Sequence, residues 1–252
     1  MTVCPEHVGT CDVRARCWSA NVTHESTRGI RFRAFVSATH FPQALAMVLL
    51  MTLSTALLGG SWWNIVFVLL ASAAGQATVG WTNDVHDAEA DLALGRRNKP
   101  TVRGEVRPDE LRLPIVVAAV LAVPFSFVAA GWVGGIAHIV AVASALMYNF
   151  VFARTAWSWA PYAVSFALMP VFIAQAVSPA LWPSPSVTVL SVLVGVTAHL
   201  LNAIPDIAID RESGFGGLAV SLGKRRSQTL AGVLVVCAAV CAVIIVSGLL
   251  ES

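Results

Sequence analysis

Two short acidic stretches carry the residue types in this chain that are best suited to chemistry. Asp84, Asp87 and Asp91 lie in the stretch NDVHDAEAD, and Asp206 and Asp210 lie in the stretch NAIPDIAID. Offsets of three and four residues place the carboxylates of each stretch on one face of a helix. Like charges in such a stripe repel one another, so each stripe costs stability unless a cation neutralises it.

Carboxylate oxygens are the ligands that hard cations prefer, and Mg²⁺ above all. Mg²⁺ typically takes one or two carboxylates and fills its other positions with water and phosphate oxygens. Each stretch has an asparagine four residues ahead of an aspartate, Asn83 in the first and Asn202 in the second, and basic residues follow each stretch. Together the stretches predict a site that holds Mg²⁺ around a diphosphate. For either stretch alone, the alternative is a solvated helix end.

Basic residues near the two stretches could neutralise a diphosphate leaving group, because Arg and Lys stabilise developing negative charge as a metal ion does. The residues expected to contact the diphosphate are Arg97, Lys99, Arg154, Arg211 and Lys224, together with Asn83. The same cations could instead set the membrane topology or bind anionic lipid headgroups.

The elements that carry these stretches are predicted to be membrane-spanning helices. Hydrophobic residues make up 57% of the chain, charged residues make up 12%, and the mean hydropathy is +0.74. Apolar runs of about 20 residues can cross a bilayer as helices, in which the backbone bonds to itself. The predicted spans are 34–58, 62–82, 112–130, 132–152, 158–178, 186–205 and 228–249. Residues 1–33 are predicted to be a flexible cytoplasmic leader, and residues 34–252 the transmembrane domain.

The basic residues indicate the orientation of this all-α, seven-span bundle. All 16 Lys and Arg residues fall on one side of the topology, and the loops on the other side have none. Loops rich in Lys and Arg stay in the cytoplasm. We therefore expect a multi-pass protein of the cell membrane with a cytoplasmic N-terminus. The two acidic stretches then lie at the cytoplasmic ends of the second and sixth spans. The bilayer is an expected partner and nucleic acid is not.

The two stretches resemble the paired motifs of the UbiA superfamily of intramembrane prenyltransferases, which includes 4-hydroxybenzoate polyprenyltransferases. Residues 83–91 fit the first motif, NDxxDxxxD, at every defined position. Residues 202–210 fit the second motif, which ends in DxxxD, although Ala203 stands where the family usually has an aspartate. The segment RESGFGGLAVSLGKR that follows also resembles the family. Tyr148 matches a tyrosine at the end of span four in many members.

The resemblance implies a helical bundle around a central cavity that opens sideways to lipid. It implies that the five aspartates bind Mg²⁺ and an isoprenoid diphosphate and are the catalytic residues, while Asn83 and Asn202 orient ligands. Ionisation of the substrate C–O bond would leave an allylic carbocation. An acceptor, which the sequence does not identify, would then capture this cation.

The substrate cavity is expected to be lined by four polar residues within the predicted spans: Gln76, Tyr148, His199 and Asn202. Gln76 lies seven residues before Asn83, and His199 lies three residues before Asn202, so each shares a helix face with its motif. The ring of Tyr148 could stabilise a carbocation through its face. The alternative for each of these residues is a hydrogen bond between helices.

The chain departs from the family at two points. Members commonly have three spans after the second motif, whereas one is predicted here. The missing pair would help to wall the cavity, so we expect a second copy of the chain, or lipid, to supply that wall. Ala203 removes a carboxylate from the second site, which we expect to lower its affinity for metal.

Other activities fit parts of the pattern. A terpene cyclase of the same superfamily would capture the cation with the substrate's own alkenes. A third variant would transfer a sugar phosphate to a polyprenyl phosphate. From a different class, the chain could be a divalent-cation transporter or a non-catalytic membrane scaffold. Transport favours carboxylates near the middle of the membrane, whereas these lie at span ends beside cations that repel a metal. The prediction is therefore prenyl transfer.

Overall fold

The computed structural model describes residues 28–94 and 99–250, and within them the side chains from residue 31 to residue 247. This part of the chain consists of helices and connecting turns, which confirms the all-α prediction. The helices are α2 (Arg28–Ser37), α3 (Phe41–Leu57), α4 (Trp62–Ala93), α5 (Pro108–Met147), the π-helix η1 (Tyr148–Phe152), α6 (Ala160–Val177), α7 (Pro185–Ala203), the 3₁₀ turn η2 (Ile204–Asp206), α8 (Ile207–Glu212), α9 (Leu218–Leu222) and α10 (Lys224–Leu250). Most of the predicted leader and Arg97 lie outside the described residues, and α2 starts within the segment predicted to be that leader.

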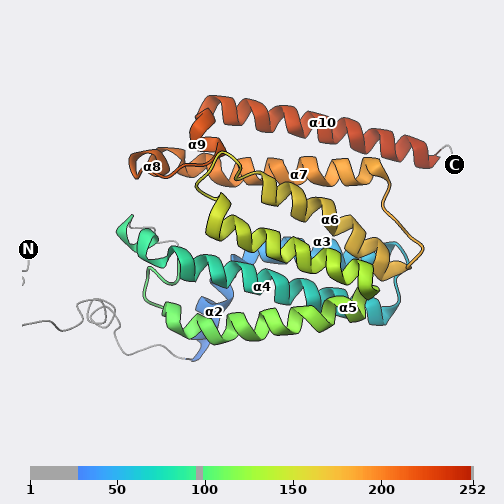
Figure 1. Ribbon diagram of the computed structural model, residues 1–252, viewed down its shortest axis with the longest axis horizontal. Coiled ribbons are helices and arrows are strands. Elements are labelled where there is room, and N and C mark those ends of the chain that lie inside the picture. Colours follow the sequence, from blue (N-terminus) through green and yellow to red (C-terminus); the bar gives the residue numbers. More distant parts are fainter. Residues whose placement is uncertain (1–27, 95–98, 251–252) are drawn as a thin grey trace, which may run out of the picture.

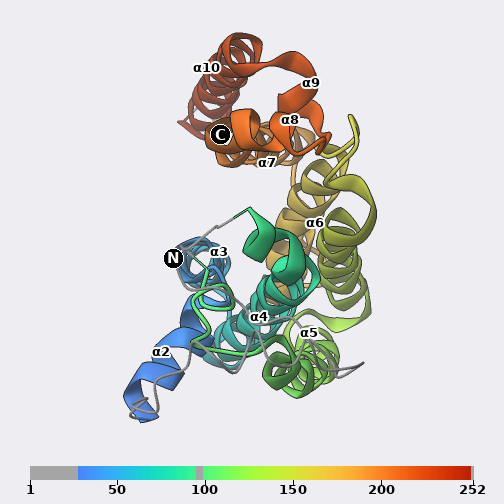
Figure 2. The ribbon, with the colours of Figure 1, turned by 90° about the vertical axis from the view of Figure 1, so that its left-hand side faces the viewer.

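The long helices run roughly parallel or antiparallel to one another (Figure 1). Each long helix packs mainly against its neighbours in the chain, from α3 through α4, α5 and α6 to α7. Helix α10 packs mainly against α7, with smaller contacts to α9 and η2. In the end-on view, α3, α4 and α5 form one side of the molecule and α7 to α10 form the other, with α6 between them (Figure 2).

The first predicted span is divided by a sharp bend. The residues of α2 from Arg31 onward and helix α3 meet at 65°. The turn between them contains His40, whose backbone is left-handed at φ 56° and ψ 52°. This conformation is uncommon for a residue with a Cβ atom, although histidine adopts it more readily than most. The bend brings His40 close to α4.

Helix α4 continues well past the predicted span end at residue 82. Ser61 caps its start, where its Oγ accepts a hydrogen bond from the backbone N of Asn64 at 3.2 Å. The residues beyond 82 contain no Gly or Pro before Gly95, and several are strong helix formers. The whole first acidic stretch therefore lies inside one regular helix, and its carboxylates keep the predicted helical spacing.

Helix α5 folds back on itself at Gly131, which has φ 62° and ψ −163°, a conformation open to glycine alone among the common residues. Ser126 Oγ lies 2.7 Å from His138 Nδ1. In a straight helix these residues would be about 18 Å apart along the axis, so the two halves must be antiparallel. In Figure 1 the green first half and the yellow-green second half approach each other at one end and run back along opposite sides of α4 in that view. The predicted break between residues 130 and 132 is therefore confirmed.

The second acidic stretch lies where the helix that begins as α7 becomes irregular. Pro205 has no N–H to donate and its ring crowds the carbonyl four residues earlier, which interrupts a regular helix. Helix α7 accordingly ends at Ala203, and Ile204–Asp206 form a 3₁₀ turn before α8 begins. A 3₁₀ turn has fewer residues per turn than an α-helix, so it shifts the angular positions of the following side chains. Asp206 and Asp210 therefore do not lie on one face of a single regular α-helix, whereas the spacing predicted that they would.

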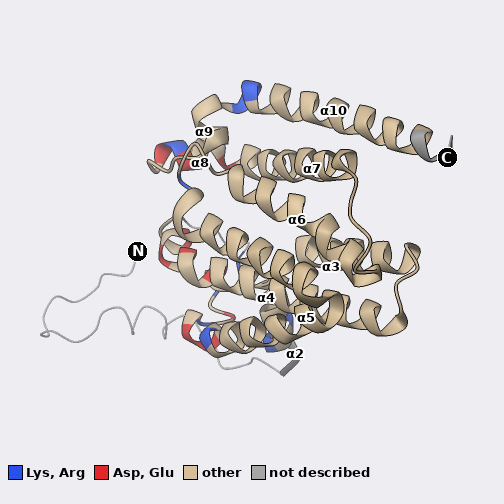
Figure 3. Ribbon diagram, turned by 45° about the vertical axis from the view of Figure 1, so that its right-hand side comes forward, with Lys and Arg blue, Asp and Glu red and all other residues tan. Residues whose placement is uncertain are grey.

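The described helices suit a membrane by length and composition. Five of them could cross a bilayer, or six if the bent pair α2–α3 is one span. A core cluster of buried residues joins α3, α4, α5 and α6 around Phe172, and many other large apolar side chains are exposed. The charged side chains gather at the end of the bundle where α4 ends, α8 lies and α10 starts, whereas the opposite end has none in the described part (Figure 3).

Candidate active site

The three carboxylates of the first acidic stretch surround one ammonium group. Lys99 Nζ lies 2.7 Å from Asp91 Oδ2, 3.3 Å from Asp84 Oδ1 and 3.9 Å from Asp87 Oδ2. Asp84 and Asp91 are each only 1% exposed, whereas Asp87 is 28% exposed. The structure therefore brings four of the predicted residues together, counting Lys99, and places the lysine against the carboxylates.

Asn83 joins this cluster to three other parts of the fold. Its Oδ1 accepts hydrogen bonds from Lys99 Nζ and from His40 Nε2, both at 3.1 Å. Its Nδ2 donates to Asp87 Oδ2 at 3.0 Å and to Asn149 Oδ1 at 3.3 Å. These bonds fix both ends of the Asn83 amide, so Asn83 orients Asp87 before any ligand binds.

His40 reaches this cluster because the α2–α3 turn lies directly on α4. A Cβ atom at Gly80 would lie 2.5 Å from the backbone oxygen of Thr39, so only glycine allows this approach. The approach puts His40 Nε2 3.3 Å from Asp84 Oδ1. The left-handed backbone of His40 is thus held beside an acidic site, and strained residues persist where the surrounding structure over-determines them.

Asp84 provides a test of whether the first stretch suits a metal ion. Its contacts with Lys99 and His40 lack hydrogen-bond angles, and neither buried carboxylate oxygen has a hydrogen-bond donor among the described residues. A buried carboxylate in this state is costly unless a cation balances it. The oxygen donors therefore fit Mg²⁺ in chemistry. In their present arrangement, however, no three His, Cys, Asp or Glu side chains of the described chain are grouped to hold a metal ion.

The second acidic stretch is more open than the first. Asp206 and Asp210 are half-buried, and Asn202 is exposed. Arg211 is also exposed, and its Nη2 donates a hydrogen bond to the backbone oxygen of Val220 at 3.0 Å, which ties α8 to α9. The structure thus places Arg211 in a contact with the backbone, where sequence reasoning expected a contact with diphosphate.

Ala203 does not face the same environment as its counterpart Asp84. It packs against a buried apolar cluster formed by α7, α8, α9 and α10, whose members are Leu200, Ile207, Ala219 and Ala231. A carboxylate at this position would be placed among apolar side chains without a partner. The alanine in the second motif therefore has a packing reason.

The turn between η1 and α6 lies next to the loop after α8. The guanidinium carbon of Arg154 lies 4.2 Å from the ring centroid of Phe215, a cation–π contact. A Cβ atom at Gly216 would lie 2.1 Å from the backbone oxygen of Arg154, so this loop can approach only because glycine stands there. Lys224 is exposed at the start of α10.

An aromatic cluster lies between the two acidic stretches. The ring centroids of Tyr148 and Tyr162 are 5.2 Å apart, and that of His199 lies 5.8 Å from the first and 4.9 Å from the second. Asn149, next to Tyr148 in η1, accepts a hydrogen bond from Asn83 of the first stretch at 3.3 Å, and His199 lies in α7 three residues before Asn202 of the second stretch. The cluster that contains Tyr148 is therefore connected to both motifs.

The remaining predicted cavity residues take different positions. Tyr162 contacts the side chain of Asn202, so Asn202 joins the aromatic cluster. His199 is buried, with Nε2 2.9 Å from Ser158 Oγ, which in turn accepts a hydrogen bond from the backbone N of Leu218. Gln76 is half-buried on α4, about one helical turn before Gly80 in the chain.

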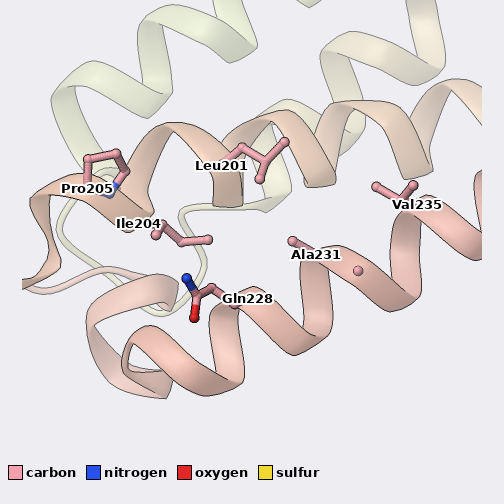
Figure 4. A pocket seen from close by; sticks show the side chains of 7 residues that line it. Leu201, Ile204, Pro205, Gln228, Ala231 and Val235 are labelled. Atoms are coloured by element: carbon pink, nitrogen blue, oxygen red, sulfur yellow. The ribbon is translucent and has the colours of Figure 1, made fainter.

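An apolar groove of about 360 Å³ lies beside the second stretch, between α7 with η2 and α10. Figure 4 shows Leu201, Ile204 and Pro205 on one side of the groove and Ala231 and Val235 on the other, with Gln228 near its polar end. No aspartate of either motif lines it. The groove adjoins the second motif through Pro205, which precedes Asp206 in the chain.

Three residues of this region were not predicted from the sequence. His40 could not be predicted, because a single histidine before a helix belongs to no recognisable sequence motif. Ser158 could not be predicted either, since serine is common in membrane helices. Tyr162 carried a signal that could have been used: it and Tyr148 are the only two tyrosines of the chain.

Comparison with known proteins places this geometry in context. Residues 44–252 match the UbiA prenyltransferase family. The fold is similar to a UbiA homologue from Archaeoglobus fulgidus bound to DMAPP and Mg²⁺, with a TM-score of 0.68 and 17% identity over 82% of this chain and 76% of that one. The same homologue bound to GPP and Mg²⁺ gives a TM-score of 0.68 at 18% identity, over 84% and 76% of the two chains.

A third similar structure is that of a digeranylgeranylglyceryl phosphate synthase, with a TM-score of 0.62 and 15% identity over 84% of this chain and 76% of that one. The search of curated proteins found no significant match to this sequence. At these identities the structural comparisons establish the fold.

Proposed function

Because the chain belongs to the UbiA prenyltransferase family, we propose that it is a Mg²⁺-dependent intramembrane prenyltransferase, which ionises an isoprenoid diphosphate and transfers the prenyl group to an acceptor. The observation that carries this proposal is the aromatic cluster of Tyr148, Tyr162 and His199, which adjoins the first stretch through the Asn83–Asn149 hydrogen bond and the second stretch through α7. Two acidic stretches beside one aromatic cluster suit a ligand with an ionic head and a cationic reacting carbon. The relatives bound to DMAPP or GPP with Mg²⁺ support the same ligand class.

The residues of the first motif would bind the metal–diphosphate end of the substrate. Asp84, Asp87 and Asp91 supply carboxylate oxygens, and Asn83 holds Asp87 in place. Mg²⁺, when bound, neutralises the negative charge that grows on the diphosphate as the C–O bond breaks. Asp206 and Asp210 would supply carboxylate oxygens to Mg²⁺ on the opposite side of the same diphosphate. Basic residues around the site would complete its neutralisation, with Arg97, Arg154, Arg211 and Lys224 as candidates.

The aromatic cluster would receive the prenyl cation. The rings of Tyr148 and Tyr162 would stabilise a positive charge without acting as nucleophiles. His199 is held by Ser158, so the cluster is rigid on its α7 side. Gln76 and Asn202 would contribute polar contacts along the path of the acceptor. The prenyl tail is apolar and would extend from this cluster toward the apolar interior of the bundle.

We propose that the described chain crosses the membrane seven times. The count takes the bent pair α2–α3 as one crossing and the two halves of α5 as two, with α4, α6, α7–α8 and α10 as the others. Both acidic stretches then lie at the end of the bundle that carries the charged side chains (Figure 3). By the positive-inside rule this end is cytoplasmic. We also propose that this membrane is the cell membrane and that a second copy of the chain packs beside the bundle.

The test is release of diphosphate from the purified full-length chain in nanodiscs with Mg²⁺. Geranyl, farnesyl and geranylgeranyl diphosphate are supplied first alone and then with an aromatic or a lipid acceptor. Release that requires an acceptor is the expected result. Hydrocarbon or alcohol formed without an acceptor would instead identify a terpene cyclase. A folded protein that releases no diphosphate under either condition would contradict both activities.

A further inference from the structure

Lys99 takes the place in the first motif that a metal ion would need. Its ammonium lies within 4 Å of oxygens from four residues, three of which are carboxylates on one helix face. Its side chain is only 12% exposed, so the contact is largely screened from water. Lys99 thus neutralises, within the chain itself, a repulsion between Asp84, Asp87 and Asp91 that would otherwise open the site.

An ammonium and a divalent metal cannot use this oxygen set at the same time. Both are compact cations that need oxygen partners, and two cations within a few ångströms of each other repel strongly in a site with little water. A metal that enters the motif must therefore displace Lys99. Alone, the metal would leave the ammonium without partners. A metal that enters with a diphosphate brings new oxygens, to which the displaced ammonium can bind.

We propose that Lys99 is a positioning residue that keeps the first motif assembled before the metal arrives and couples the entry of metal to the entry of diphosphate. This inference rests on the proposed function, because it takes the first motif as the metal–diphosphate site. It makes a distinct claim about the ligand-free protein: divalent metal binds weakly by itself because Lys99 competes with it. Coupling between two ligands is reciprocal, so diphosphate also binds more tightly when metal is present.

The test measures Mn²⁺ binding to the full-length chain in nanodiscs by the electron paramagnetic resonance signal of free Mn²⁺. The variant Lys99→Met keeps the length and apolar stem of the side chain and removes its charge. Without diphosphate, Lys99→Met should bind Mn²⁺ about 5–150-fold more tightly than the wild type, the usual range for coupled sites. An unreactive thiodiphosphate analogue of the prenyl substrate should tighten Mn²⁺ binding in the wild type and do so much less in Lys99→Met.

The control is Arg103→Met, which removes a positive charge that acts electrostatically on Asp84. The Arg103 guanidinium is paired with Glu105, whose Oε1 lies 2.7 Å from Arg103 Nε. If general charge explains the effect, Arg103→Met should tighten Mn²⁺ binding as much as Lys99→Met does, and that result overturns the inference. If Lys99→Met does not fold, Lys99→Gln replaces it as a neutral, polar side chain.

The remaining outcomes separate this inference from the proposed function. Equal Mn²⁺ affinity in the wild type and Lys99→Met, with diphosphate release still dependent on Asp87, would overturn the role of Lys99 and leave the proposed function intact. Absence of Mn²⁺ binding in every variant, with and without the analogue, would overturn both. A second readout follows from the repulsion between the carboxylates: metal-free Lys99→Met should unfold at a lower temperature than the wild type, and Mn²⁺ should reverse that loss.

Discussion

The first acidic motif lies inside one regular helix, whereas the second lies across a break. Asp84 and Asp91 are buried in α4 and share the charge of Lys99, and Asn83 and His40 fix the polar groups around them. Asp206 and Asp210 are half-buried around the 3₁₀ turn at Pro205. Two stretches that are nearly equivalent as sequences thus differ in how much of their site is already assembled.

This difference shows that the residues packed against a motif determine how many polar partners its site already has. Position two of the motif is Asp84 in the first stretch, where it faces the lysine and the histidine. The same position is Ala203 in the second stretch, where it packs against an apolar cluster. Preorganised polar groups cost no rearrangement when a ligand binds. We therefore expect the first motif to rearrange less than the second when a metal–diphosphate ligand binds.

The largest expected effect comes from removing one carboxylate of either motif. Asp87→Ala and Asp206→Ala should each lower the rate of diphosphate release by about 10³-fold or more, because each removes several kcal/mol of charge stabilisation in the transition state. The measurement is diphosphate release in nanodiscs under saturating Mg²⁺. Full activity in Asp206→Ala together with loss in Asp87→Ala would show that the second motif is not part of the site.

A second change tests the packing reason for Ala203. Ala203→Asp should destabilise the protein by about 2 kcal/mol, because the new carboxylate at this half-buried position would lie against apolar side chains without a partner. The matched control is Ala208→Asp on α8, where the alanine is exposed and the same substitution should have little effect. Thermal unfolding of the two variants in nanodiscs gives the comparison. If Ala203→Asp instead folds normally and binds Mn²⁺ more tightly, the two motifs are more alike than their packing indicates.

His40 permits a sharper test of preorganisation in the first motif. His40→Ala removes the contacts to Asn83 and Asp84 and should weaken Mn²⁺ binding by about 10–100-fold, as is usual for residues that support metal ligands. His40→Gly removes the same contacts and also relieves the left-handed backbone. Both variants should lose metal affinity, while His40→Gly should be the more stable of the two. Wild-type Mn²⁺ affinity in His40→Gly would mean that only the turn, and not the side chain, matters.

The smallest effects concern the approach of the α2–α3 turn to α4. Gly80→Ala forces a Cβ atom to within 2.5 Å of the Thr39 oxygen, so it should cost about 1–3 kcal/mol of stability and move His40 away from the motif. Gly232→Ala in α10 is the control, because no atom from elsewhere in the described fold lies within 4 Å of where its Cβ atom would stand. Alanine is the better helix former, so Gly232→Ala should be neutral or slightly stabilising. Equal thermal midpoints for the two variants would contradict the close approach.

The sequence was sufficient for the first motif because that motif obeys a single periodicity. Asp84, Asp87 and Asp91 meet one lysine because the helix runs through them without interruption. Hydropathy was likewise sufficient to find the break at Gly131, since two apolar runs flank a glycine. Lys99 was predicted to contact diphosphate, and the structure places it against the carboxylates. Its contact with the carboxylates depends on the path of the chain after α4, which local spacing does not describe.

The rest depended on tertiary contacts that leave no local pattern. His40 acts through a left-handed turn that is held in place by Gly80, far along the sequence. The irregular helix at Pro205 could have been expected from the proline, and the apolar surroundings of Ala203 could not. Tyr162 and Ser158 come from α6 and the turn before it, which sequence reasoning treated as a plain span. In each case a contact between distant segments, rather than spacing along one helix, selects the residue.

The turn at Gly131 also constrains how the chain enters a membrane during synthesis. Ser126 Oγ donates a hydrogen bond to the backbone oxygen of Ala122 in its own half and pairs with His138 across the turn, so the second half of α5 alone would bring the His138 ring into hydrocarbon without this partner. The cost disappears only when the second half has emerged from the ribosome and folded back on the first. We therefore expect the two halves to leave the translocon together as a helical hairpin, and not one after the other.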